Sequence, residues 1–267
     1  MKLFDTHAHF DLFEEKGTVP AVLARAEEAG VERICAVGSA EASNALAVRL
    51  ASERPDRIVA AVGYDRDQVD KPRDMEKLAA LASRPGVVAV GEIGLDYYYS
   101  AETAPAQRVL CGQMLEFAAE RGLPVLVHSR YADQDTVAML TEFSTVWKKV
   151  FHGMENPPPP GVLHCFTGDA GLAEALLALG FYISFSGIVS FHNAGPLREV
   201  ARRVPEDRCL IETDCPYLTP RPYRGKVNEP AYAARVAEVL AEARGVPAEA
   251  MAAATFANAR RVFQLEG

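Results

Sequence analysis

The sequence predicts an α/β fold, a single-domain (β/α)8 TIM barrel over residues 1–267, and three observations support this prediction. Short β-branched runs alternate with longer Ala-rich or amphipathic runs along the whole chain, as in a parallel sheet with helical connections. Eight such strand-like runs fit into 267 residues, a usual length for a barrel. No Gly-x-Gly-x-x-Gly follows the first strand, so a doubly wound open sheet, the alternative, lacks its best support.

The expected strands are short apolar runs with many β-branched residues. They are Leu3–His9, Arg33–Gly38, Ile58–Gly63, Val87–Ile93, Pro124–His128, Val162–Phe166, Tyr182–Ser186 and Cys209–Thr213. The expected helices lie between the strands, and several end at a glycine, a common residue after a helix C-terminus. They are Pro20–Ala29, Glu41–Glu53, Met75–Ser83, Ala106–Arg121, Gly171–Leu179, Glu229–Ala243 and Ala248–Phe263. Ser39 and Asp74 each precede a helix and are its expected caps.

Charge and composition exclude several classes of protein. The 28 basic and 36 acidic residues give a net charge of −8, which argues against a protein that coats nucleic acid through a broad basic face. An enzyme that acts on one phosphodiester remains possible. No apolar run approaches the roughly 20 residues of a membrane helix, and no apolar leader follows Met1. The five cysteines form no Cys-x-x-Cys, so we expect reduced thiols, a cytoplasmic location and no membrane partner.

His7 and His9 are two residues apart on the first expected strand. Residues at this spacing point to the same face of a strand, so the two imidazoles are expected side by side inside the barrel. Two imidazoles in this arrangement suit a divalent metal ion. A pair of hydrogen-bonded core histidines is the alternative.

Four further polar residues stand near the ends of apolar strands, namely Glu92, His128, His164 and Asp214. A charged or imidazole group in such a place is unfavourable unless it has a partner. All four are expected at the rim where barrel enzymes carry their active sites. Together with the histidines of the first strand they supply four imidazoles and two carboxylates, enough for two divalent ions bridged by a carboxylate. Such mixed donors suit Zn or Mn, and Mg suits a carboxylate-rich half of the site.

Cations and aromatic residues near the same rim are candidates for substrate binding. Arg130 follows the fifth expected strand, and Arg224 and Lys226 lie in a Pro- and Gly-rich loop after the eighth. These three side chains are expected to bind phosphate through charge-assisted hydrogen bonds, and a solvated loop is the alternative for the last two. The run Tyr97–Tyr99 either stacks on a base or covers the end of the barrel.

The remaining histidines and cysteines are weaker candidates. His192 follows the seventh strand and either contacts substrate or is an ordinary loop residue. His152 lies in residues 147–160, which end in four prolines and are expected to form an inserted surface loop. Cys165 and Cys215 follow two of the metal-ligand candidates, and strand alternation predicts that both point away from the metals.

Seven segments of the chain together resemble the TatD family of metal-dependent deoxyribonucleases and related hydrolases, within the wider group of amidohydrolase barrels. The resemblance runs from Phe4 to about Phe263, and its motifs are highly specific in combination. The segments are residues 5–11 (DTHAHFD), 91–98 (GEIGLDYY), 123–130 (LPVLVHSR), 164–168 (HCFTG), 212–220 (ETDCPYLTP), 224–230 (RGKVNEP) and 258–263 (NARRVF).

The resemblance implies a role for each metal-ligand candidate. It implies that one metal is held by His7, His9 and Asp214, that the second is held by His128 and His164, that Glu92 bridges the two, and that Asp214 takes the proton from the attacking water.

The expected function is that of a divalent-metal-dependent deoxyribonuclease acting on DNA, of the 3′–5′ exonuclease type, and a monomer is expected. The alternative is a hydrolase of the same scaffold acting on an amide, a lactone or a small phosphoester. Glu92 favours the nuclease mildly, because amide hydrolases of this scaffold often carry a lysine at that strand. A non-enzymatic binding protein is disfavoured by the complete set of six ligand candidates.

Two departures from the family pattern concern the substrate. The family has a His-Pro pair after strand three, whereas here Gly63 is followed by Tyr64 and Asp65. This change is expected to remove a polar group from the rim. The segment before His164 is longer than the family norm, and it either reshapes substrate access or is a tolerated insertion with no role.

Overall fold

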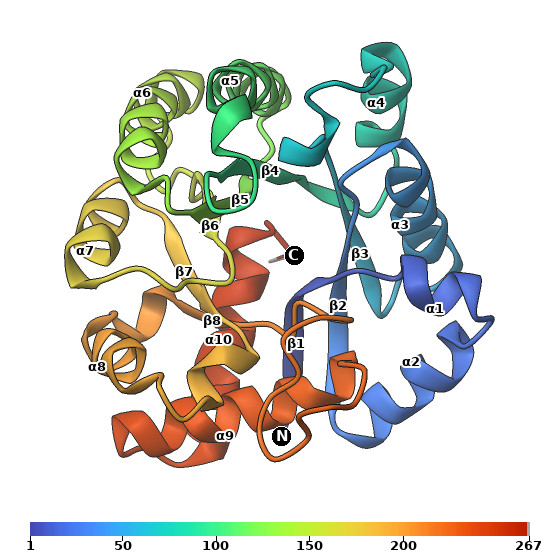
Figure 1. The fold of residues 1–267 in the computed structure, drawn as a ribbon, viewed down its shortest axis with the longest axis vertical. Coiled ribbons are helices and arrows are strands. Elements are labelled where there is room, and N and C mark those ends of the chain that lie inside the picture. Colours follow the sequence, from blue (N-terminus) through green and yellow to red (C-terminus); the bar gives the residue numbers. More distant parts are fainter. Residues whose placement is uncertain (266–267) are drawn as a thin grey trace.

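A computed structural model describes residues 1–265, and in this range eight parallel strands form a nearly closed barrel surrounded by helices (Figure 1). The strands are hydrogen-bonded in chain order, from first to last. The barrel closes between its last and first strands, where the His9 N–H donates to the Cys215 carbonyl at 2.8 Å and the Asp214 N–H donates to the His7 carbonyl at 2.9 Å. The predicted fold class is confirmed.

Each of the eight strands overlaps an expected strand. They are β1 (Leu3–Ala8), β2 (Val31–Val37), β3 (Ile58–Val62), β4 (Val87–Asp96), β5 (Val125–Arg130), β6 (Gly161–Leu163), β7 (Tyr182–Phe185) and β8 (Cys209–Ile211). Strands β6 and β8 end earlier than expected. For β6 the reason is local, because Cys165 lies within the expected strand and has a φ angle of 46°, which an extended strand cannot contain.

Ten helices connect and cover the strands. They are α1 (Asp11–Glu15), α2 (Val19–Glu28), α3 (Glu41–Glu53), α4 (Met75–Ala82), α5 (Ala104–Arg121), α6 (Asp133–Val150), α7 (Ala170–Ala178), α8 (Gly195–Arg203), α9 (Ala233–Arg244) and α10 (Ala248–Val262), within residues 1–265. The seven expected helices are all present, and α1, α6 and α8 are additional. Asp74 caps α4 as predicted, by accepting the Lys77 N–H. Ser39 does not cap α3, because Ala40 occupies the N-cap position; the hydroxyl of Ser43 accepts the N–H groups of Ser39 and Ala40.

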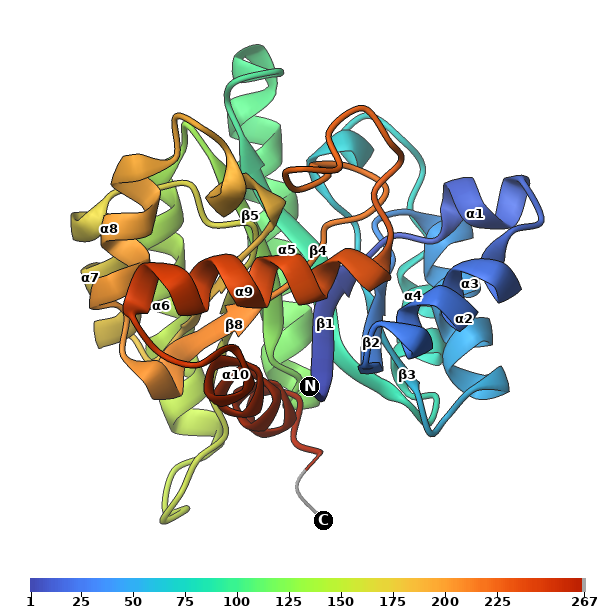
Figure 2. The ribbon, with the colours of Figure 1, turned by 90° about the horizontal axis from the view of Figure 1, so that it is seen from below.

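The hydrophobic core consists of two clusters, one between the strands and the helices and one inside the barrel. The larger cluster joins the strands to the surrounding helices. The smaller one combines alternate strand residues such as Phe4, Leu126 and Leu210 with residues of α10 and, among the described residues, none from α1 to α9. Ring contacts link Phe4 to Phe263 at 5.6 Å. Helix α10 lies across the barrel end where both termini lie (Figure 2). Helix α10 does not cover the opposite end, where the carboxyl ends of the strands lie, so polar residues can gather there (Figure 2).

The segment before β6 differs from its prediction. Helix α6 runs to Val150, so Trp147 is helical, and its Nε1 donates to the Pro158 carbonyl at 2.8 Å. The rest of the segment leads into the first residue of β6 and projects from the barrel end that carries the termini (Figure 2). The interpretation that it reshapes substrate access is therefore wrong, because it lies at the end opposite the carboxyl ends of the strands (Figure 2), and the alternative of a tolerated insertion is favoured.

No helix within residues 1–265 has the combination of length and apolar character that crossing a membrane requires.

Candidate metal centre

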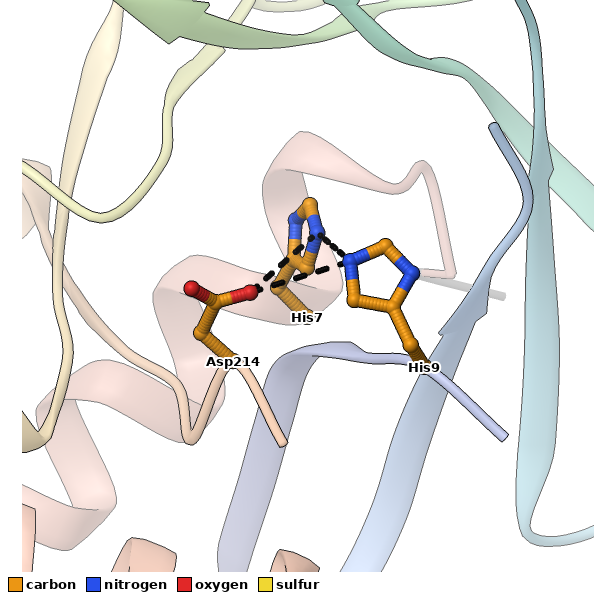
Figure 3. A group of neighbouring side chains, drawn as sticks. All are labelled: His7, His9 and Asp214. Carbon is orange, nitrogen blue, oxygen red and sulfur yellow. Dashed lines mark hydrogen bonds and ion pairs between the residues drawn. The ribbon is translucent and has the colours of Figure 1, made fainter. Parts of the chain in front are cut away.

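The carboxyl ends of the strands bring all six ligand candidates into one cluster. His7 lies in β1 and His9 directly after it, and Asp214 follows β8, so the closure of the barrel sets these three side by side (Figure 3). Glu92 and His128 come from β4 and β5, and His164 follows β6.

Glu92 lies between two pairs of histidines. Its Oε2 is 3.6 Å from Nε2 of His7 and 3.3 Å from Nε2 of His9. Its Oε1 is 3.4 Å from Nδ1 of His128 and 3.4 Å from Nε2 of His164. Asp214 adds a second carboxylate on the first side, with Oδ1 3.9 Å from His7 Nε2 and 3.7 Å from His9 Nε2. Two groups of donors therefore share one carboxylate.

The donor atoms fit divalent metal ions. Nε2 of His7 and Nε2 of His9 face each other at 3.1 Å, and Nε2 of His164 is buried without a hydrogen-bond partner. A buried ring nitrogen without a partner is unfavourable, and a metal ion satisfies it. Ligand atoms of His7, His9 and Asp214 lie within 4.8 Å of one another, as do those of His7, Glu92 and His164. Imidazole and carboxylate donors together suit Zn or Mn.

Three of the histidines are oriented by a second contact. His9 Nδ1 lies 3.1 Å from the Val37 carbonyl, and His164 Nδ1 lies 3.3 Å from Glu212 Oε1. His128 Nε2 lies 3.2 Å from Asp96 Oδ2. Each contact fixes the ring so that its other nitrogen faces Glu92, as is usual for metal-binding histidines.

The sequence analysis did not select the two carboxylates that orient these rings. Asp96 is the last residue of β4, and Glu212 directly follows the end of β8. Glu212 precedes Asp214 by two residues, the same spacing that drew attention to His7 and His9, so a signal was present.

Burial and charge shift the pKa values of the histidines in opposite directions. Burial and, to a smaller extent, the charge of His164 together lower the pKa of His7 to about 3, although the contact with Glu92 acts against them. Burial also acts to lower the pKa of His164, but the carboxylates of Glu212 and Glu92 outweigh it and raise that pKa to about 10. His7 is therefore held neutral, whereas His164 carries a proton at neutral pH in the metal-free protein.

The carboxylates of the cluster also differ. Burial opposes ionisation of Glu92, but the charges of Arg66 and His164 outweigh it and hold its pKa well below the usual range. Burial raises the pKa of Asp214 to about 7, although the charges of His164 and His9 act against it. Glu92 is thus a permanent anion, and Asp214 is able to exchange a proton near neutral pH.

Arg66 enters the cluster although the sequence analysis did not select it. Its Nη1 donates to Glu92 Oε1 at 2.5 Å and lies 3.4 Å from Asp65 Oδ2. Tyr64, in contrast, is buried, and its hydroxyl bonds to the backbone of Asp74. The expectation that this departure removes a polar group from the rim is therefore wrong, because the two residues that follow Tyr64 bring an anion and a cation to it.

The pocket beside the cluster has a volume of about 760 Å³ and is lined in part by Arg130, Tyr99 and Tyr131. The guanidinium of Arg130 lies over the ring of Tyr98 at 3.9 Å and over that of Tyr99 at 4.7 Å. The hydroxyl of Tyr97 donates instead to Asp135 at 2.6 Å. The structure therefore places Arg130 and Tyr99 at the pocket, and Tyr98 packs against Arg130.

Several weaker candidates lie elsewhere. Arg224 donates to the Thr219 carbonyl at 3.0 Å and covers Phe191, and Lys226 lies over the ring of Tyr223, so the structure does not bring these two cations to the cluster. The remaining candidates are two histidines that line other pockets, His152 and His192.

The two cysteines behave differently from each other. Cys215 is fully buried. Cys165 lines the pocket beside the cluster, so the prediction that it points away is wrong. Alternation fails there because β6 ends at Leu163 and Cys165 has a positive φ.

Comparison with known proteins agrees with this arrangement. The model of the family described as TatD related DNase matches residues 4–264. The metal-dependent hydrolase YcfH of Escherichia coli, described as uncharacterized, is 43% identical over 100% of this chain and 97% of its own length. YabD of Bacillus subtilis, also described as an uncharacterized metal-dependent hydrolase, is 38% identical over 98% of this chain and 99% of its own. The crystal structure of YjjV, a TatD homologue from Escherichia coli, superposes with a TM-score of 0.88 at 33% identity and covers 98% of both chains.

Proposed function

Because the chain belongs to the family of TatD-related DNases and is a metal-dependent hydrolase, we propose that it is a deoxyribonuclease that shortens DNA from the 3′ end. The observation that carries this proposal is the position of Glu92, whose two oxygens face separate histidine pairs. Such a shared carboxylate suits two divalent ions acting on one phosphodiester.

Each side of Glu92 would hold one ion, Zn, Mn or Mg. On one side the ligands would be Glu92 Oε2, His7, His9 and Asp214, and on the other Glu92 Oε1, His128 and His164. Divalent ions supply Lewis acidity, which makes hydroxide available near neutral pH and offsets the charge of a phosphodiester.

Asp214 is the proposed general base. Its carboxylate lies at the cluster and lines the pocket, so it would be able to contact both a bound metal ion and the attacking water. Burial raises its pKa to about 7, near the pH at which a general base works best. The hydrogen bond from the Asp214 N–H to the His7 carbonyl fixes its backbone against β1.

The aromatic rim of the pocket supports a nucleic-acid substrate. Tyr98, Tyr99 and Tyr131 are 53%, 71% and 75% exposed, and Arg130 lies over the rings of Tyr98 and Tyr99 and also lines the pocket. Exposed rings bind unstacked bases, and a guanidinium binds phosphate. Such a rim suits the frayed or single-stranded end of DNA. The net charge of −8 does not prevent this binding, because only the few groups at the rim contact the DNA.

A small phosphoester is the second candidate substrate. It is favoured by the placement of Arg224 and Lys226, which bind their own loop rather than the cluster and leave few cations along a longer strand. An amide or a lactone, the other substrates considered for this scaffold, carries no negative charge that Arg130 could bind.

The test is digestion of end-labelled single-stranded DNA by metal-free protein, with Mn²⁺ or Mg²⁺ added back. We expect metal-dependent shortening from the 3′ end and its loss in Glu92→Gln. Parallel assays with a small phosphodiester, a lactone and an amide decide between the candidates. If folded, metal-loaded protein hydrolyses the small ester but not DNA, the nuclease proposal is wrong.

A further inference from the structure

Arg66 contacts the oxygen of Glu92 that faces His128 and His164. It lies at the start of a short 3-10 helix (Arg66–Gln68) after β3, and Asp65 caps that helix by accepting the Asp67 N–H. The guanidinium is mostly buried and lines both pockets that contain Asp214. Its Nη1 donates to Oε1 of Glu92 at 2.5 Å, whereas Oε2 of the same carboxylate faces only histidines among the described residues.

The two oxygens of Glu92 are therefore unequal. Oε2 is available to an ion held by His7 and His9. Oε1 faces His128 and His164 but already accepts a hydrogen bond from a permanent cation. A divalent ion binding a carboxylate oxygen lies about 2.0–2.2 Å from it, so an ion on Oε1 and the Arg66 guanidinium would be two positive groups on one oxygen.

We propose that Arg66 is a built-in competitor for the second metal ion, so that the two sites of this protein fill in sequence, the first tightly and the second only when Arg66 is displaced from Glu92. The inference rests on the metal ligands named under the proposed function and not on DNA being the substrate.

A place for the displaced side chain exists. Asp65 Oδ2 lies 3.4 Å from Arg66 Nη1 and is also buried, so the guanidinium can keep a carboxyl partner after it leaves Glu92. The same movement would leave the guanidinium within the pockets that it already lines. The arrangement has two alternative partners for one cation, which is what a displaceable competitor requires.

The experiment is calorimetric titration of metal-free protein with Mn²⁺, in the wild type and in the neutral variants Arg66→Met and Arg66→Gln. In the wild type we expect two steps, with the second Kd at least about tenfold weaker than the first. In both variants the second Kd should tighten by at least about tenfold, because the competing charge is gone, while the first changes little. The electron paramagnetic resonance signal of a coupled Mn²⁺ pair should then develop at a lower Mn²⁺ concentration.

Arg130→Met is the matched control, because it removes a cation from the same pocket without touching Glu92. Its two Kd values should match the wild type. Thermal unfolding establishes that each variant is folded, and agreement between the Met and Gln variants excludes an effect of side-chain shape.

Two results would overturn the inference, namely equal affinity of both sites in the wild type, or an unchanged second Kd in both folded Arg66 variants. A folded wild type that binds no Mn²⁺ would instead refute the metal ligands themselves. Binding of two ions without DNA cleavage would leave the inference standing and refute the nuclease.

Discussion

Glu212 lies directly behind His164, with its Oε1 3.3 Å from Nδ1 of the ring, and both side chains are buried. The same oxygen accepts the Cys165 N–H at 2.7 Å, so the carboxylate is fixed by the backbone as well. The ring is thereby oriented with Nε2 toward Glu92. Glu212 is a positioning residue for the candidate metal site, and it makes no contact with the pocket that would bind substrate.

Replacement of Glu212 by Gln should therefore weaken metal binding while the protein stays folded. Loss of a group that orients a metal-binding histidine usually lowers metal affinity by about 10–100-fold. The measurement is calorimetric titration of metal-free protein with Mn²⁺. Glu174→Gln, an exposed change on α7, is the control and should match the wild type. Equal affinities in the two variants would show that Glu212 does not position His164 for a metal.

Metal affinity should rise with pH above neutrality. Glu212 and Glu92 outweigh burial and raise the pKa of His164 to about 10, so the metal-free protein carries a proton on this ring at pH 7. A metal ligand must be unprotonated, so binding releases that proton, and the affinity should increase up to about tenfold per pH unit between pH 7 and pH 9. Titrations in buffers of different ionisation enthalpy count the protons released. A flat affinity with no proton release would contradict the assignment of His164 as a ligand.

The strands and the cluster were predictable because both have local signals. Each strand is a short apolar run, and a histidine or acid at the end of such a run stands out. Arg66 was missed for the opposite reason. It resembles an ordinary charged residue in sequence, and its partner, Glu92, is 26 positions away. Glu212 carried a spacing signal two residues before Asp214, but its partner, His164, is 48 positions away. Only the closed barrel brings these pairs together.

Loops and strand ends were the less predictable parts. Cys165 follows a strand that ends earlier than its apolar run, since the backbone turns to a positive φ there, and alternation cannot be extended through such a turn. Arg224 and Lys226 lie in a loop with the composition of a phosphate-binding segment, yet they contact the carbonyl of Thr219 and the ring of Tyr223. Composition indicates which groups a loop offers but not where they point.

Truncation of Tyr99 should weaken binding of single-stranded DNA. The ring is 71% exposed and lines the pocket beside the cluster. Stacking of a base on an aromatic ring contributes about 1–3 kcal/mol, so Tyr99→Ala should raise the KM for DNA by about 5–150-fold with little change in kcat. Hydrolysis of a small phosphodiester without a base should be unaffected. Tyr97→Phe, which alters a hydroxyl bound to Asp135, is the control. An unchanged KM for DNA in Tyr99→Ala would exclude this ring from substrate binding.

A methyl group at Gly94 should destabilise the protein at the edge of the candidate metal site. Gly94 has a φ of +134° in β4, and an added Cβ would lie 2.0 Å from the carbonyl oxygen of His128. His128 cannot retreat without moving its own ring from Glu92. Overpacking of this kind costs about 1–3 kcal/mol, and the positive φ adds strain, so Gly94→Ala should lower the free energy of unfolding by at least that much.

Gly112→Ala tests the same chemical change where the structure has room for it. Gly112 lies within α5, and among residues 1–265 an added Cβ there would meet only the Met139 Cε at 3.9 Å, an ordinary contact. Alanine is favoured over glycine inside a helix by about 0.5–1 kcal/mol, so this variant should be slightly more stable than the wild type. Urea unfolding of both variants gives the two free energies. If Gly94→Ala proved as stable as Gly112→Ala, β4 could not pack against His128 as closely as the structure places it.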